Sequence, residues 1–70
     1  MEARSYTVSE ESVENGYPVR HKRTWTETEH GYMDKTYRDG QLVALSLWGR
    51  KDPSFARYIG EEGRKALGLA

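Results

Sequence analysis

The stretch Gln41–Gly49, with the sequence QLVALSLWG, decides how this chain of 70 residues folds. Successive side chains of an extended strand point to opposite sides. The apolar side chains of this stretch fall on both sides, with Val43, Leu45 and Leu47 on one and Leu42, Ala44 and Trp48 on the other. The pattern therefore predicts a strand that is apolar on both faces and needs cover on both.

Three turn signals divide the chain: Asn15-Gly16, His30-Gly31 and Asp39-Gly40. Each ends in glycine, which adopts a positive φ without a side-chain clash. The segments between them are rich in Thr, Tyr, Val and Trp, residue types that are common in strands. The spacing predicts an antiparallel meander with strands at about 5–12, 17–28, 32–38 and 41–48.

The Asp39-Gly40 turn sets the register of the last predicted hairpin. A two-residue type I′ turn places Tyr37 opposite Leu42. An unbroken ladder beyond this pair sets Lys35 opposite Ala44. Tyr37 would then share a face with Leu42, Ala44 and the tryptophan at the end of the strand.

The turn at His30-Gly31 leaves two positions open for Trp25. A two-residue loop puts Trp25 on the same face as Val43, whereas a three-residue loop with a bulge puts it with Trp48. The residues alone do not decide between these two arrangements.

The segment after Lys51 has the pattern of a helix start. Asp52 supplies a capping carboxylate, and Pro53 presets φ at the first helical position. Phe55, Ile59 and Ala66 then fall on one apolar stripe. We expect a helix over about 53–66 whose apolar face packs on the sheet.

These elements predict an α+β fold in a single small domain that spans residues 1–70. Its expected form is a small antiparallel β-meander of three to four strands, over about 5–48, with one C-terminal helix packed on one face. Seventy residues are too few for two independent cores. The expected core residues are Val8, Val19, Trp25, Val43, Leu45, Leu47, Phe55 and Ile59.

One helix covers only one face of a small sheet, so the second face of strand 41–48 has to be accounted for in another way. The N-terminal segment could fold across it, or its apolar side chains could simply be exposed, which is common. The third possibility is that a protein partner or a second copy of the chain covers it, because exposed apolar patches mark contact sites.

Composition narrows the class of protein. Hydrophobic residues make up 36% and charged residues 31%, with two Trp, five Tyr and one Phe, which is typical of a folded chain with a small core. Eleven basic and eleven acidic residues cancel, so no overall charge attracts nucleic acid or a membrane. There is no cysteine, no signal-peptide pattern and no run long enough to cross a bilayer. We expect a cytoplasmic protein that gains stability as a homo-oligomer or with a partner.

The function that these features favour is a small non-catalytic interaction module of bacterial or phage type. It would bind a protein partner or itself through the sheet face or edge that the helix leaves uncovered. Aromatic and large apolar side chains contribute most to contact energies, so the expected partner-binding residues are Tyr37, Leu42 and Trp48.

The alternative is a nucleic-acid-binding module that uses basic side chains on the sheet. If Arg20, Lys22 and Lys35 align on one face, they offer donors to phosphate groups. Against this stand the neighbouring acids Glu27, Glu29 and Asp34, which would repel phosphate.

No pattern predicts catalysis, a metal or a cofactor. Glu27, Glu29 and Asp34 offer oxygen ligands, but no loop supplies the further carbonyls and carboxylates of a calcium site. His21 and His30 have no second histidine or cysteine at a metal-ligand spacing. We therefore expect neither an enzyme nor a catalytic residue, and no cofactor, metal or membrane contact.

Overall fold

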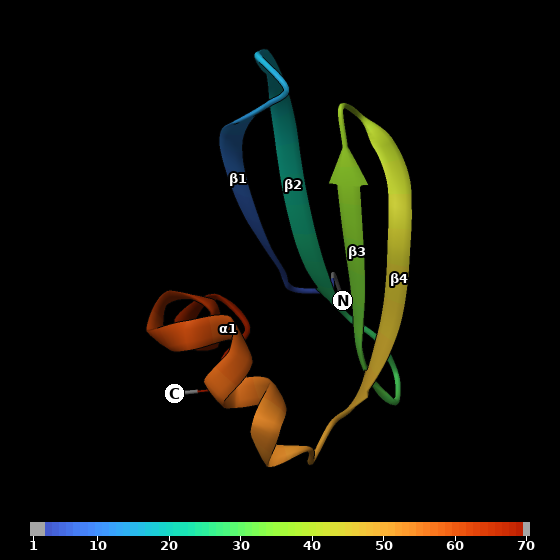
Figure 1. Cartoon of the computed structure of the whole chain (residues 1–70). Helices are drawn as coiled ribbons and strands as arrows, with labels where there is room; N and C mark the ends of the chain where they lie inside the picture. The colour runs from blue at the N-terminus through green and yellow to red at the C-terminus, as the bar shows by residue number, and fades with distance from the viewer. Residues whose placement is uncertain (1–2, 70) are drawn as a thin grey trace.

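The structure, a computed structural model, describes residues 3–69. Within this range, four strands form one antiparallel sheet in the order β1-β2-β3-β4, and one helix, α1, follows (Figure 1). The elements are β1 Ser5–Glu14, β2 Tyr17–Glu27, β3 Gly31–Arg38, β4 Gln41–Gly49 and α1 Pro53–Ala66. The predicted α+β meander with a C-terminal helix is confirmed.

The outer two turns have the backbone that the sequence predicts. Asn15 and Gly16 have φ values of 53° and 82°, and Asp39 and Gly40 have 48° and 84°. Positive φ at both central residues is the mark of a type I′ turn, whose twist matches that of the flanking strands. These two turns lie at the end of the sheet away from α1 (Figure 1).

The middle turn lies one residue earlier than the sequence analysis put it. The Thr28 N–H donates to the Gly31 carbonyl at 2.8 Å, and the Gly31 N–H donates to Thr28 Oγ1 at 3.1 Å. Glu29 and His30 are therefore the loop residues, rather than His30 and Gly31. This turn pairs Trp25 with Asp34.

The ladder between β3 and β4 is not unbroken, because it shifts between Thr36 and Tyr37. Tyr37 pairs with Leu42 as predicted, but Thr36 pairs with Ala44, which leaves Val43 as an extra residue in β4. The predicted pairing of Lys35 with Ala44 is wrong, since a bulge moves all later partners by one position. The pairs beyond it are Lys35 with Leu45, Asp34 with Ser46, Met33 with Leu47 and Tyr32 with Trp48.

Cross-strand partners share a face, so the register defines two faces of the sheet. The inner face, on which α1 lies, carries Tyr6, Trp25, Tyr32 and Trp48. The outer face carries Thr24, Met33, Lys35, Tyr37, Leu42, Leu45 and Leu47. The bulge thus leaves β4 with large aliphatic side chains on the outer face and with Ala44, Ser46 and Trp48 on the inner face.

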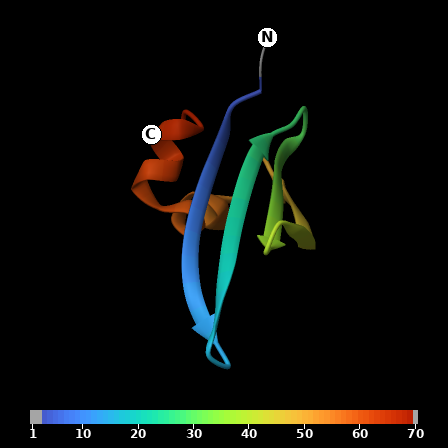
Figure 2. The same ribbon diagram turned by 90° about the horizontal axis from the view of Figure 1, so that it is seen from above.

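Figure 2 shows α1 beside one face of the sheet, and the core lies between α1 and this inner face. Its buried members are Trp25, Tyr32, Phe55, Ile59 and Leu67, with Tyr6, Trp48 and Leu69 packed against them. Val19 is also buried, as predicted. The predicted core positions Val8, Val43, Leu45 and Leu47 are exposed instead. Leu45 and Leu47 lie on the outer face, whereas Val8 lies on the part of the inner face that α1 leaves open.

The helix begins as its sequence predicts. Asp52 Oδ1 accepts hydrogen bonds from the Ser54 N–H at 3.0 Å and from Ser54 Oγ at 2.6 Å, and Pro53 follows the cap. Inside the helix, Gly60 has φ 76° and ψ −178°, which bends α1 into two parts (Figure 1). Gly63 lets the second part approach β1, because a Cβ there would lie 3.1 Å from the Tyr6 ring.

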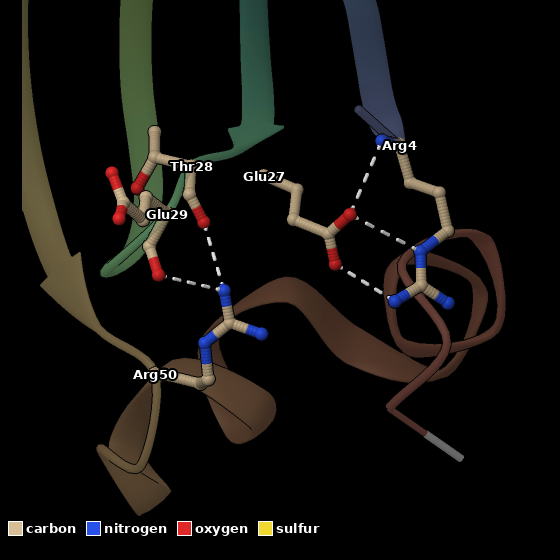
Figure 3. Close-up of polar contacts among 5 residues, drawn as sticks. All are labelled: Arg4, Glu27, Thr28, Glu29 and Arg50. Carbon is tan, nitrogen blue, oxygen red and sulfur yellow. Dashed lines mark hydrogen bonds and ion pairs between the residues drawn. The ribbon is translucent and has the colours of Figure 1, made fainter. Parts of the chain in front are cut away.

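Two arginines tie the chain together at the end that carries α1 (Figure 3). Arg4 forms an ion pair of 2.7 Å with Glu27 and so joins the start of β1 to the end of β2. Arg50 donates to the carbonyl oxygens of Thr28 and Glu29 at 2.9 and 3.0 Å and so joins the end of β4 to the middle turn. Both contacts therefore lie at the end of the sheet from which the chain continues into α1.

We expect Gly31→Ala to destabilise the fold by about 2 kcal/mol. A Cβ on Gly31 would lie 1.8 Å from the backbone oxygen of Trp48, so the end of the β3-β4 ladder would have to move. Gly49, the ladder partner of Gly31, is the matched control, because a Cβ there meets nothing within 4 Å. Urea unfolding measures both variants, and equal losses of stability would contradict this account.

We also expect Glu27→Gln to change how stability depends on pH. The hydrogen bond from Arg4 holds the pKa of Glu27 below its ordinary value of 4.5, so the ionised carboxylate stabilises the fold. A depressed folded-state pKa gives stability that is present above the unfolded pKa and is lost as pH falls through the folded pKa.

The difference in urea midpoint between the wild-type chain and Glu27→Gln should therefore narrow as pH falls from about 7 to about 3. In an Arg4→Gln background the same substitution should have little pH-dependent effect. A difference that stays constant with pH would show that Arg4 does not hold this carboxylate.

Candidate interaction surface

The exposed apolar surface of the sheet is concentrated on β4. Leu42, Leu45 and Leu47 lie on the outer face and form what we call the leucine row, with exposed fractions of 50%, 50% and 72%. Val43, the extra residue of the bulge, is also exposed. Exposed apolar patches are common at the contact sites of proteins.

The edge position of β4 adds an unpaired backbone to this surface. β4 is the last strand in the sheet order, and no described segment lies along its free side (Figure 1). Residues 41–49 include neither a charged side chain nor a proline, the features that usually protect an edge strand from pairing. The other edge strand, β1, carries Glu10, Glu11 and Glu14.

The three predicted partner-binding residues do not lie together. Tyr37 and Leu42 are cross-strand partners on the outer face, so they are adjacent. Trp48 lies on the inner face, where its ring is 5.3 Å from that of Phe55 and 5.4 Å from that of Tyr58. Trp48 is half-buried against α1, and its part in partner binding stays a prediction.

The basic residues of the alternative prediction do lie on one face. Lys22 pairs with Tyr37, and Lys35 pairs with Thr24 and Leu45, so both lysines lie on the outer face beside the leucine row. Arg20 lies on the same face, opposite Glu11 of β1. The Lys22 ammonium sits 4.7 Å from the centre of the Tyr37 ring, an arrangement in which a cation is attracted to the aromatic face.

None of the three acids expected to repel phosphate lies on the outer face, because Glu27 and Asp34 are on the inner face and Glu29 is in the middle turn. Glu27 pairs with Arg4, and Asp34 is only 2% exposed. Asp34 accepts from the Arg23 guanidinium at 3.3 Å and from Trp48 Nε1 at 3.4 Å, so its charge is compensated inside the fold. The outer face is therefore free of both carboxylates.

A groove occupies the part of the inner face that α1 leaves open. It has a volume of about 490 Å³ and opens to solvent over β1 and β2. Its lining includes Val8, Glu10, Ser12, His21, Arg23, Trp25 and Thr36. No pattern in the sequence indicates this groove, because it depends on which half of the sheet α1 covers.

Next to this groove, Ser12, His21 and Glu14 come together in a way that sequence spacing did not reveal. Ser12 Oγ lies 3.0 Å from His21 Nε2, and a Glu14 carboxylate oxygen lies 3.4 Å from the same nitrogen. In Ser-His-acid catalysis the serine and the acid contact different ring nitrogens. Glu14 also pairs with Arg38 at 2.6 Å, so the cluster links three strands and lacks the geometry of a catalytic triad.

Residues 3–69 also lack the features of a metal site and of a membrane-spanning helix. No cluster of three or more His, Cys, Asp or Glu side chains there could hold a metal ion. The helix in this range is too short and too polar to span a membrane. Comparison with protein-family models, with curated proteins and with solved structures finds no match to this chain.

Proposed function

We propose that the chain is a small non-catalytic interaction module that binds a protein partner, or itself, through the outer side of β4. The observation that carries this proposal is the leucine row on an edge strand without charge. Burial of apolar surface contributes roughly 25 cal/mol per Å², so covering such a row favours association. The unpaired backbone beside it can add the hydrogen bonds of strand addition.

The same features argue for an extended polypeptide as the partner. Strand addition gains affinity from backbone hydrogen bonds, and alternate side chains of the added strand meet the face of the sheet. An added strand would set its apolar side chains against Leu45 and Leu47 on the outer face. A partner strand rich in apolar and β-branched residues fits this surface best.

We expect a random-peptide display library, panned on the immobilised chain, to yield apolar peptides whose binding depends on the leucine row. Leu45→Lys combined with Leu47→Lys should weaken their binding at least about tenfold, or ~1.4 kcal/mol, because the contact would bury two charges without partners. Affinity of the selected peptides for each variant is the measurement.

The control is Val13→Lys, which adds a charge at a position that is 74% exposed on the other edge strand. It should leave peptide affinity unchanged, and circular dichroism should report the same fold for all variants. Binding that persists after the two leucine substitutions would overturn the proposed function.

A second candidate function, nucleic-acid binding, is favoured by the alignment of Lys22 and Lys35 on one face away from Asp34. Phosphate contacts release counterions, so binding of a labelled oligonucleotide should fall steeply between about 50 and about 200 mM salt. Lys22→Gln with Lys35→Gln should lower the salt slope, the steepness of the fall of log binding constant with log salt concentration, by roughly two.

The matched control for this test is Lys51→Gln with Lys65→Gln, which removes two exposed positive charges outside the sheet. It should leave the salt slope near that of the wild-type chain. Equal slopes for the two double variants would mean that the outer face does not bind phosphate.

A further inference from the structure

We propose that the polypeptide that pairs with β4 is the β4 strand of a second copy of this chain. The two strands would run antiparallel about a two-fold axis at Ser46 and join two four-stranded sheets into one of eight strands. This inference rests on the proposed function, because it uses the same strand and names its partner.

The first argument is the contrast between the two edges of the sheet. Self-pairing along β1 would bring Glu10 and Glu11, near the middle of the strand, close to the same acids of the other copy, and like charges on paired strands repel. Self-pairing through β4 brings no charge against another, because residues 41–49 have none. Of the two edges, only β4 is suited to an identical neighbour.

The second argument is that the regular part of β4 is complementary to itself. The bulge interrupts the strand at Val43, so the regular ladder with β3 runs from Ala44 to Trp48. Antiparallel pairing about Ser46 sets Leu45 of each copy opposite Leu47 of the other. Four leucines then meet on the outer face, and each contact occurs twice, as a two-fold interface requires.

The third argument concerns the inner face at the same axis. Ser46 would lie opposite its own copy, and the small Ala44 would lie opposite Trp48 of the second copy. A small side chain opposite a tryptophan leaves room for the ring, which already rests against α1. Neither pair buries a charge.

The nearest basic side chains do not oppose this pairing. Lys35 lies on β3, next to Leu45, so the two copies of Lys35 would be separated by both β4 strands. Three strand spacings amount to about 14 Å. This exceeds the Debye length of about 8 Å at physiological salt, so their repulsion is largely screened.

The position of α1 leaves the edge accessible. Among the strands, β1 is the one with which α1 has its main backbone contacts, at the opposite edge of the sheet. Figures 1 and 2 both show α1 on the β1 side, with the free side of β4 turned away from it. A second sheet can therefore approach β4 without displacing the helix.

The chain contains no cysteine, so a single introduced thiol reports where two copies meet. Ser46→Cys puts a thiol at the proposed axis, and Ser9→Cys puts one on the other edge strand, at a serine that is also exposed. We expect sedimentation to give a dimer for the wild-type chain. Mild oxidation should yield about tenfold more disulfide-linked dimer from Ser46→Cys than from Ser9→Cys, because antiparallel partners lie at disulfide distance.

A wild-type chain that stays monomeric across a dilution series would overturn the inference. So would a dimer that links through Ser9→Cys as readily as through Ser46→Cys, because the contact would then lie elsewhere. A dimer that dissociates in high salt would point to a charged interface and would also overturn it.

Peptide binding distinguishes failure of the dimer inference from failure of the proposed function. A monomeric chain that still binds selected peptides through Leu45 and Leu47 overturns only the identity of the partner. A monomeric chain whose peptide binding ignores both leucines overturns the proposed function as well.

Discussion

An extra residue in β4, Val43, shifts its ladder with β3 by one position, and every later contact of β4 depends on that shift. Because side chains alternate along a strand, a one-residue shift exchanges the faces of all residues beyond it. Trp48 thereby pairs with Tyr32 on the inner face, while Leu45 and Leu47 come to lie on the outer face with Leu42. The sequence predicts a strand that is apolar on both faces, whereas in the structure its large aliphatic side chains lie on the outer face only.

The core of this chain forms on the inner face, where aromatic side chains of the sheet pack against α1. Stacked rings of Tyr32 and Phe55, with centres 4.4 Å apart, lie at the middle of the contact between α1 and the sheet. The buried carboxylate of Asp34 is compensated by Arg23, whose guanidinium lies 4.6 Å from the centre of the Tyr58 ring. Aromatic packing and this one charge pair hold α1 on the inner face. The helix therefore leaves the outer face uncovered.

The outer face combines the leucine row with Lys22 and Lys35. The leucines favour an apolar partner, and the lysines favour phosphate. Apolar contact and phosphate binding respond oppositely to salt, so the two candidate functions differ in a property that can be measured on the purified chain. The edge backbone of β4 favours a polypeptide, since a nucleic acid does not complete a β-ladder. In a two-fold dimer the basic side chains would flank four central leucines.

The sequence alone determined the elements: the two type I′ turns from Asn-Gly and Asp-Gly, the helix start from Asp52-Pro53, and the pairing of Tyr37 with Leu42. These features are local, because turn and cap chemistry acts over a few neighbouring residues. Part of the candidate surface followed as well, since Lys22, Lys35 and Leu42 were singled out before their shared face was known.

Only the tertiary structure decided which face α1 covers and which face β4 exposes. The bulge at Val43 carries no residue signature of its own, and a shift of one position moves side chains between core and solvent. Leu45 and Leu47 were therefore expected in the core, and the contact between Ser12 and His21 was not expected at all. Local pattern determines that a strand forms, whereas the packing of distant segments determines which of its sides is buried.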